Sequence, residues 1–293
     1  MLLAACTRNA AELRPSPSVS PSVVTSPTVT PSPQPSPTPD PPHVFVIVLE
    51  NRSYSQVVDS GYIAELAAKY GLATNYHGIT HPSLPNYLAM TSGSTWGVAD
   101  DGWHSLPAGG LGQQLSDAGI HWRAYMEGMG ASCYRNGNGY ALKHNPFAYY
   151  GDECPAQVVP FTQFASDMGG AVPHFVWITP DLCHDGHDCS NSVVSAWLGQ
   201  TVPVILNSEA WQTNGVLFVT YDEGGDSANS VLTLVIRPDQ VNLRSSVAYD
   251  HYSLLASIED LLGLSRLGGA VNAAPMTDLL ATKPPTTPPL LSP

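Results

Sequence analysis

Basic residues are scarce in this chain, and long hydrophobic runs are missing. Lys and Arg together number 11 of 293 residues, against 24 Asp and Glu, which gives a formal net charge of −13 at pH 7. Nucleic-acid partners normally need a basic face, and adhesion to an anionic membrane needs basic clusters. No apolar stretch reaches the length of a membrane span, and no internal repeat is present. The composition therefore argues against nucleic-acid and anionic-membrane partners.

Two sequence signatures are also missing. The Gly-x-Ser-x-Gly turn does not occur, which disfavours a metal-free serine esterase. The five cysteines include no Cys-x-x-Cys pair, so zinc ligation is only the second interpretation of them. Four cysteines that follow a candidate export signal indicate two disulfides, with three possible pairings. Short spacing favours Cys133–Cys154 and Cys183–Cys189.

The ends of the chain have the composition of an exported protein. Leu3-Ala4-Ala5-Cys6 is similar to a bacterial lipobox, in which Cys6 would be lipidated, and residues 1–14 would be a truncated signal region whose true start lies upstream. A chance match is the alternative. Residues 15–42 predict an extended Pro/Ser/Thr-rich linker, and residues 283–293 a Pro-rich tail. We expect an extracellular or cell-surface lipoprotein that meets the membrane only through this anchor.

Residues 43–282 are expected to form one α/β catalytic domain. Residues 44–49, 174–179 and 216–220 are continuous apolar runs typical of buried parallel strands. Helical spacing recurs between and after them. The pattern predicts a mostly parallel central sheet with helices on both faces, whose ligands bind beyond the carboxyl ends of the strands. Further strands are expected at 73–77, 121–126 and 231–236, helices at 62–70, 110–119, 195–206 and 252–264, and a Gly-rich loop at 128–151.

Carboxylate and amide side chains follow two of these strands. Glu50 and Asn51 come directly after residues 44–49, and Asp222 and Glu223 follow the strand at 216–220. Charged groups at such positions are costly to desolvate unless they are paired or bind a cation. The four residues therefore predict a divalent metal site, which Ca²⁺, Mg²⁺, Mn²⁺ or Zn²⁺ could occupy.

Ser83 is the candidate nucleophile. It lies between Pro82 and Pro85 ahead of an apolar segment, so we expect it to be the N-cap of a helix. Free backbone N–H groups and the helix dipole favour an anion there. Because Ser is a common N-cap in any protein, Ser83 gains weight only from the predicted metal site nearby.

Histidines supply most of the remaining candidates. His187 is the expected general acid, since imidazole titrates near neutral pH. Asp185 and Asp188 flank it and could orient imidazole rings. The residues expected to bind phosphate or substrate are His81, Asn86, His144, Asp185 and His251.

Five short segments resemble, in order, motifs of the bacterial phosphoesterase family. This family contains acid phosphatases and phospholipases C and belongs to the alkaline-phosphatase-like superfamily. The segments are Glu50-Asn51-Arg52-Ser53, His81-Pro82-Ser83-Leu84-Pro85-Asn86-Tyr87, Asp185-Gly186-His187-Asp188, Tyr221-Asp222-Glu223-Gly224-Gly225 and His251-Tyr252-Ser253.

The resemblance implies an alkaline-phosphatase-like fold and a phosphoseryl intermediate at Ser83. It implies that Glu50, Asn51, Asp222 and Glu223 surround the metal. The acid phosphatases have a second Asp where this chain has Glu223, so the resemblance supports direct ligation by Asp222 more strongly than by Glu223. The leading interpretation is an exported, metal-dependent acid phosphatase acting on phosphomonoesters. The alternatives are a phospholipase C-like phosphodiesterase and a non-catalytic surface lipoprotein that binds a ligand.

Overall fold

The computed structural model describes residues 41–238, 240 and 242–281. The predicted lipobox with Cys6, residues 15–40 of the predicted linker and the predicted tail at 283–293 lie outside these residues. Among the described helices, none has the length and apolar character that a membrane crossing requires.

Eight strands of the described part form one sheet in the order β5-β4-β6-β1-β7-β8-β2-β9. From β5 to β7 in this order, each strand pairs with the next in parallel. Strand β8 is antiparallel to both of its neighbours, β7 and β2. The bounds are β1 His43–Leu49, β2 Gly71–Ala73, β4 Trp122–Met126, β5 Val158–Pro160, β6 Phe175–Thr179, β7 Gly215–Tyr221, β8 Thr233–Ile236 and β9 Arg244–Ser245. A separate pair joins β3 (Tyr76–His77) to β10 (Tyr249–Asp250).

The central strands are apolar along their whole length because both faces of the sheet are covered. Every residue of β7 is buried, as is every residue of β1 after His43. A strand buried on both faces has no polar alternation. Burying each large aliphatic side chain contributes about 1.5–3 kcal/mol, so these runs form the core of the domain.

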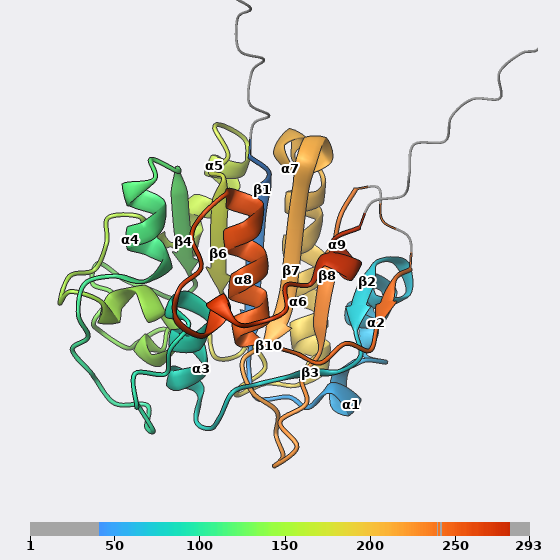
Figure 1. The fold of residues 1–293 in the computed structure, drawn as a ribbon, viewed down its shortest axis with the longest axis horizontal. Coiled ribbons are helices and arrows are strands. Elements are labelled where there is room, and N and C mark those ends of the chain that lie inside the picture. The colour runs from blue at the N-terminus through green and yellow to red at the C-terminus, as the bar shows by residue number, and fades with distance from the viewer. Residues whose placement is uncertain (1–40, 239, 241, 282–293) are drawn as a thin grey trace, which may run out of the picture. The chain divides into compact units, whose positions relative to one another are not determined.

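Helices lie on both faces of the sheet, as predicted (Figure 1). On the near face, α8 lies in front of the sheet, and α3 packs against α8 and α4. Behind the sheet, α6 packs against α2, α5 and α7. The helices are α1 Tyr54–Val57, α2 Gly61–Lys69, α3 Ser83–Ser92, α4 Gly110–Asp117, α5 Phe164–Met168, α6 Asn191–Leu206, α7 Glu209–Asn214, α8 His251–Leu262 and α9 Thr277–Leu280, with short 3₁₀ turns η1 Leu142–His144, η2 Pro146–Tyr149, η3 Phe161–Gln163 and η4 Gly268–Val271.

Three predicted elements differ from the structure. The strand expected at 73–77 is divided between β2 and β3, which belong to different sheets. Helix α6 begins at Asn191 rather than at residue 195, because the extended backbone of Ser190 provides the cap. The expected loop at 128–151 contains the two 3₁₀ turns η1 and η2.

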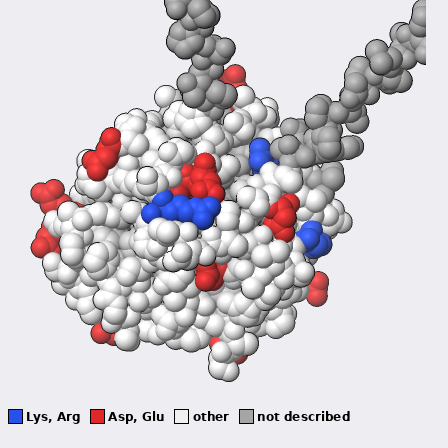
Figure 2. All heavy atoms as spheres, in the orientation of Figure 1, with Lys and Arg blue, Asp and Glu red and all other residues white. Residues whose placement is uncertain are grey.

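The parallel strands β4, β6, β1 and β7 are neighbours, so their carboxyl ends meet at the lower edge of the sheet in Figure 1. Ligands of open α/β sheets bind at this kind of edge. On the face of the described residues that Figure 2 shows, basic side chains are few and form no large patch. The fold thus brings the segments after four strands to one place.

Candidate active site

Ser83 is the first residue of α3 and is fully buried. The helix therefore starts one residue earlier than predicted, with Pro82 in extended conformation as its cap. The Ser83 hydroxyl does not cap the helix; it donates to Glu50 Oε2 at 3.0 Å and lies 3.5 Å from Glu223 Oε1. The residues predicted after β1 and β7 thus converge on the predicted nucleophile.

Glu50 lies at the centre of a buried set of polar groups. Its Oε1 accepts a hydrogen bond from the Tyr87 hydroxyl at 2.6 Å and lies 3.2 Å from His144 Nε2. On the other side of the ring, His144 Nδ1 lies 3.3 Å from Asp185 Oδ2. Glu50, His144 and Asp185 are spaced so that one ion could bind all three. His144 and Asp185 therefore lie where they could act as metal ligands, not only as the phosphate contacts we expected.

Asp222 approaches Ser83 from the end of β7. The backbone N–H of Asn51 donates to Asp222 Oδ1 at 3.1 Å, so Asn51 contacts this cluster through its backbone. Glu223 Oε2 lies 2.6 Å from Nδ1 of His81, whose side chain is 46% exposed. His81 thus lies at the open side of the site. We call Glu50, Ser83, His144, Asp185, Asp222 and Glu223 the Ser83 cluster.

Two residues predicted to bind phosphate are engaged elsewhere. The Asn86 carboxamide accepts from the N–H groups of Ile79 and Thr80 and donates to the carbonyls of Thr80 and Pro82. These four hydrogen bonds fill its capacity, so Asn86 holds the loop that precedes Ser83. Binding of phosphate by Asn86 stays a prediction.

His251 is fully buried behind Asp222. Burial lowers the pKa of His251 to about 4, so the ring is neutral near pH 7. Its Nε2–H then donates to the Asp222 carbonyl at 2.5 Å, and the Tyr76 hydroxyl donates to Nδ1 at 3.0 Å. Both ring nitrogens are thus engaged, and one of them holds the Asp222 backbone. Binding of phosphate by His251 stays a prediction.

Lys143 is the cation beside the cluster. It pairs with Asp101 at 3.0 Å, and Asp101 also accepts from the backbone N–H of Leu84, the residue after the nucleophile. His187 lies on the other side of Lys143, with Nε2 3.5 Å from the ammonium. The His187 Nδ1 lies 2.7 Å from Asp188 Oδ1, a contact that can orient the ring. His187 is about one-third exposed, so it can reach a leaving group in solvent.

Burial governs the electrostatics of the Ser83 cluster. It raises the pKa of Glu50 and of Asp222 well above their ordinary values, and it raises the pKa of Asp185 to about 7. Repulsion between the carboxylates adds to the first two shifts. Burial lowers the pKa of His144 well below its ordinary value. The buried carboxylates therefore need a cation or a proton.

The donor set fits a divalent metal ion. Among the described residues, Asp222 Oδ2, Asp185 Oδ2 and His144 Nε2 are buried without a hydrogen-bond partner. Such atoms are rare in folded proteins, and a ligand often explains them. Oxygen donors suit Ca²⁺, Mg²⁺ and Mn²⁺, while His144 also admits Zn²⁺. The cluster can thus hold a metal, and the donors do not decide which one.

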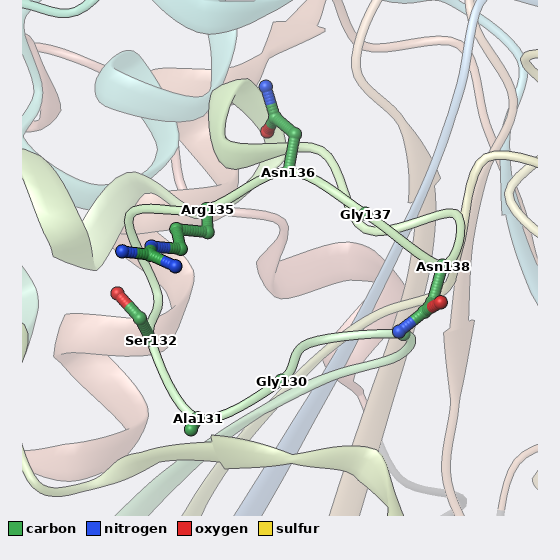
Figure 3. A pocket seen from close by; sticks show the side chains of 8 residues that line it. Gly130, Ala131, Ser132, Arg135, Asn136, Gly137 and Asn138 are labelled. Carbon is green, nitrogen blue, oxygen red and sulfur yellow. The ribbon is translucent and has the colours of Figure 1, made fainter.

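Both predicted disulfides are present. Cys133–Cys154 closes the Gly-rich segment, and Cys183–Cys189 closes the loop that carries Asp185 and His187. The Gly-rich segment encloses a cavity of about 450 Å³, in which Arg135 and Ser132 lie on one side and Asn138 on the other (Figure 3).

The sequence did not single out Tyr87, Asp101 or Lys143 as site residues. Tyr87 follows Ser83 by four positions, so helical spacing could have placed both on one face of α3. Lys143 directly precedes His144, which was a candidate. Asp101 lies in an irregular segment, and no local pattern connects it with Ser83.

The chain is similar to known phosphatases. A model of the Phosphoesterase family matches residues 57–265. An acid phosphatase of Aspergillus fumigatus is 28% identical over 262 residues, which are 82% of this chain but 59% of that protein. A phosphatidylinositol-3-phosphatase of Mycobacterium tuberculosis is 32% identical over 253 residues, which cover 81% of this chain and 82% of that protein.

Solved structures support the fold. A Vibrio parahaemolyticus protein of the alkaline phosphatase superfamily has a TM-score of 0.59 at 13% identity, over 77% of this chain and 67% of its own. Murine ectonucleotide pyrophosphatase/phosphodiesterase 5 has a TM-score of 0.58 at 11% identity, over 79% of this chain and 99% of its own. The predicted alkaline-phosphatase-like fold is confirmed. Because the family match spans more than half of its residues, this chain belongs to the Phosphoesterase family.

Proposed function

We propose that this chain is a metal-dependent phosphatase that hydrolyses phosphomonoesters through a phosphoseryl intermediate at Ser83. One observation carries the proposal. The hydroxyl of a fully buried serine at the start of α3 faces two carboxylates, Glu50 and Glu223, beside buried atoms that have no partner among the described residues. A structural serine has no need of such surroundings.

The chain's own residues can carry out both halves of the reaction. Ser83 Oγ attacks phosphorus while its proton leaves towards Glu50 Oε2, which already accepts its hydrogen bond. The bond from phosphorus to the alkoxide breaks, and His187 gives the alkoxide a proton. Water then attacks phosphorus and gives a proton to His187, the Ser83–phosphate bond breaks, Ser83 Oγ takes its proton back from Glu50, and inorganic phosphate leaves. Lys143 stabilises the phosphoryl oxygens by its charge.

A metal would be held by Glu50, Asp222 and Glu223, with Asn51 alongside. His144 and Asp185 lie next to Glu50 and could supply further ligands. When bound, it would supply a Lewis acid that favours the ionised Ser83 hydroxyl and a negatively charged phosphoryl group. Asn86 and His251 keep the Ser83 loop and Asp222 in position for this role.

The names of the relatives support a phosphomonoester substrate. The A. fumigatus relative is called an acid phosphatase, and the M. tuberculosis relative a phosphatidylinositol-3-phosphatase. Both names describe the removal of a monoester phosphate. A small phosphomonoester is therefore the first candidate. A phosphoinositide monoester is the second, and it is supported by the M. tuberculosis protein, which matches over more of its own length than the A. fumigatus protein does. A phospholipase C-like diester cleavage is the remaining alternative.

We further propose that the chain is exported and anchored through Cys6. The two disulfides support export, because structural disulfides are typical of oxidising compartments. Metabolic labelling with a radioactive fatty acid tests the anchor, since label that persists in a Cys6→Ser variant would contradict it.

The reaction is tested with p-nitrophenyl phosphate, bis(p-nitrophenyl) phosphate and a short-chain phosphatidylinositol 3-phosphate. We expect turnover of the monoesters, its loss in chelator and its return with added metal. Ser83→Ala should lower kcat at least about 10³-fold. Ser92→Ala is the matched control, because Ser92 lies on the same helix and its hydroxyl bonds to the Leu88 and Ser94 carbonyls and to the Trp96 indole rather than to a carboxylate.

The covalent step has its own readout. Rapid acid quenching of the wild type with substrate should give a chain heavier by one phosphoryl group, and Ser83→Ala should give none. Preference for the diester would replace the phosphatase assignment with a phospholipase C-like one. Full turnover in Ser83→Ala would overturn the nucleophile.

A further inference from the structure

We propose that Glu127, Asp181 and His184 form a second metal site, which takes a divalent transition-metal ion such as Zn²⁺. We call these three residues the Glu127 cluster. They lie outside the Ser83 cluster, and no step of the proposed reaction uses them. Glu127 follows β4, while Asp181 and His184 lie in the loop after β6.

His184 lies at ligand-to-ligand distance from both carboxylates. His184 Nδ1 lies 3.0 Å from Glu127 Oε2 and 3.4 Å from Asp181 Oδ1. Each residue offers one ligand atom, and the three atoms all lie within 4.8 Å of one another. Ligands at about 2.0–2.2 Å from a tetrahedral or octahedral zinc ion lie about 3.0–3.5 Å apart.

Backbone and indole N–H groups satisfy most of the carboxylate oxygens, including Glu127 Oε2, which accepts from the Asp181 N–H at 3.0 Å, but they do not explain why two carboxylates face one imidazole nitrogen. His184 Nδ1 faces two carboxylates, yet an imidazole nitrogen has at most one proton to donate. Among the described residues, no Lys or Arg forms an ion pair with Glu127 or Asp181. A divalent ion bound to a neutral imidazole would balance both carboxylates, whereas a protonated His184 would leave one negative charge.

The carboxylates are held by groups that leave room for an ion. Asp181 Oδ1 accepts from the N–H groups of Cys183 and His184, at 3.0 and 2.9 Å, and Asp181 Oδ2 has no hydrogen-bond partner among the described residues. The Trp197 indole N–H donates to Glu127 Oε1 at 3.3 Å. Partners of this kind orient the ligands of metal sites.

The local backbone is fixed on both sides of Asp181. Cys183–Cys189 closes the loop, and the backbone of Gly139, with a φ of +82°, approaches so closely that a Cβ there would lie 2.9 Å from the Asp181 Cβ. The Leu182 N–H donates to the Gly139 carbonyl at 2.9 Å. The ligands are thus preorganised, which lowers the cost of binding an ion.

The cluster opens to solvent through a cavity of about 410 Å³ whose walls include Glu127, His184, Phe161 and Trp197. An ion can therefore enter, and water from the cavity can complete its coordination. One imidazole and two carboxylates suit Zn²⁺ or Mn²⁺ better than Ca²⁺, which prefers oxygen ligands alone.

The site would act on the reaction only through the loop. His184 points to the Glu127 cluster, while the next residue, Asp185, faces His144 in the Ser83 cluster. An ion that binds Asp181 and His184 would fix the segment that presents Asp185 and His187. Its role is therefore positional.

Metal stoichiometry tests the proposal without measuring activity. The full chain is stripped with EDTA, loaded with Zn²⁺ and gel-filtered, and zinc per chain is measured by mass spectrometry. Glu127→Gln with His184→Gln should lose one zinc ion per chain. Asp222→Asn with Glu223→Gln is the matched control and should keep that ion, even if the Ser83 cluster holds none.

A second measurement uses Trp197, whose ring stacks 6.2 Å from the His184 ring. Co²⁺ should quench part of the tryptophan fluorescence of the wild type, and Trp197→Phe should remove that part. Equal zinc content in the wild type and in folded Glu127→Gln with His184→Gln would overturn the site. Unchanged Co²⁺ quenching in Trp197→Phe would also overturn it. If Glu127→Gln with His184→Gln loses zinc and Asp222→Asn with Glu223→Gln loses none, the result would support the site while contradicting the proposed catalytic metal.

Discussion

The Ser83 cluster and the Glu127 cluster lie at neighbouring strand ends and share the loop after β6, but they differ in burial. Glu50, Asp185 and Asp222 are fully buried, whereas the side chains of Glu127 and Asp181 are about one-fifth exposed. The first cluster contains buried atoms that have no hydrogen-bond partner in the part of the chain that the structure describes; in the second, backbone amides and an indole satisfy most of the oxygens.

This difference predicts two kinds of metal binding. In the Ser83 cluster burial raises the pKa of the carboxylates, and a bound ion would stabilise their charged forms. Ion binding there is therefore coupled to the stability of the fold as well as to the reaction. In the Glu127 cluster solvent already screens the charges, so an ion there should exchange more readily and contribute less. Burial, more than the number of carboxylates, separates a catalytic centre from a positional site.

The largest expected effect comes from exchanging one carboxylate in each cluster. Asp222→Asn should lower turnover by about 10²–10³, because it removes negative charge beside the nucleophile while keeping the shape of the side chain. Asp181→Asn should lower turnover by less than about tenfold, since it acts only through the loop. Steady-state kinetics on p-nitrophenyl phosphate measure both. Equal losses would abolish the distinction between the clusters.

An intermediate effect is expected for the disulfide that both clusters share. Cys183 and Cys189 are six positions apart, and cross-linking a loop of this size stabilises a protein by about 2 kcal/mol in the chain-entropy model. Replacing both residues with Ser should lower the free energy of unfolding by about that amount. Urea unfolding followed by tryptophan fluorescence measures it, and an unchanged midpoint would show that the loop is held by other contacts.

The smallest effect concerns Glu259, a buried carboxylate in neither cluster. Burial raises its pKa to about 8, and its Oε2 has no hydrogen-bond partner among the described residues. Between about pH 4.5 and pH 8 the folded chain keeps a proton on Glu259 that the unfolded chain has released. The free energy of unfolding therefore falls as the pH rises through this range.

Glu259→Gln should accordingly raise the melting temperature by about 2–4 °C at alkaline pH and change it little at acidic pH. Chelator should not alter this difference, because Glu259 has no neighbouring ligands. Glu65→Gln, at an exposed position of α2, is the control. A gain that is equal at both pH values would show that protonation is not its cause.

The central sheet was predictable because its strands are continuous apolar runs, and such runs need cover on both faces. The same logic placed Glu50 and Asp222 at one edge. The division of residues 73–77 between two sheets was not predictable, because it depends on which distant strands, β8 and β10, pair with each half.

The individual roles within the site were harder to predict. Asn86 and His251 lie in the motifs that carried the resemblance, and both turned out to hold other groups in place. A motif records that a residue is near the site, but it does not record which way its side chain points.

The sequence by itself determined the class of fold, the disulfide pairs and the segments that meet at the site, because hydrophobic patterning and short spacings are local properties of the chain. Only the tertiary structure decided that Glu50 joins Ser83 to His144, that His251 supports Asp222 and that Glu127 meets His184. Those contacts join residues far apart in sequence, and their energies depend on burial, which no local pattern specifies.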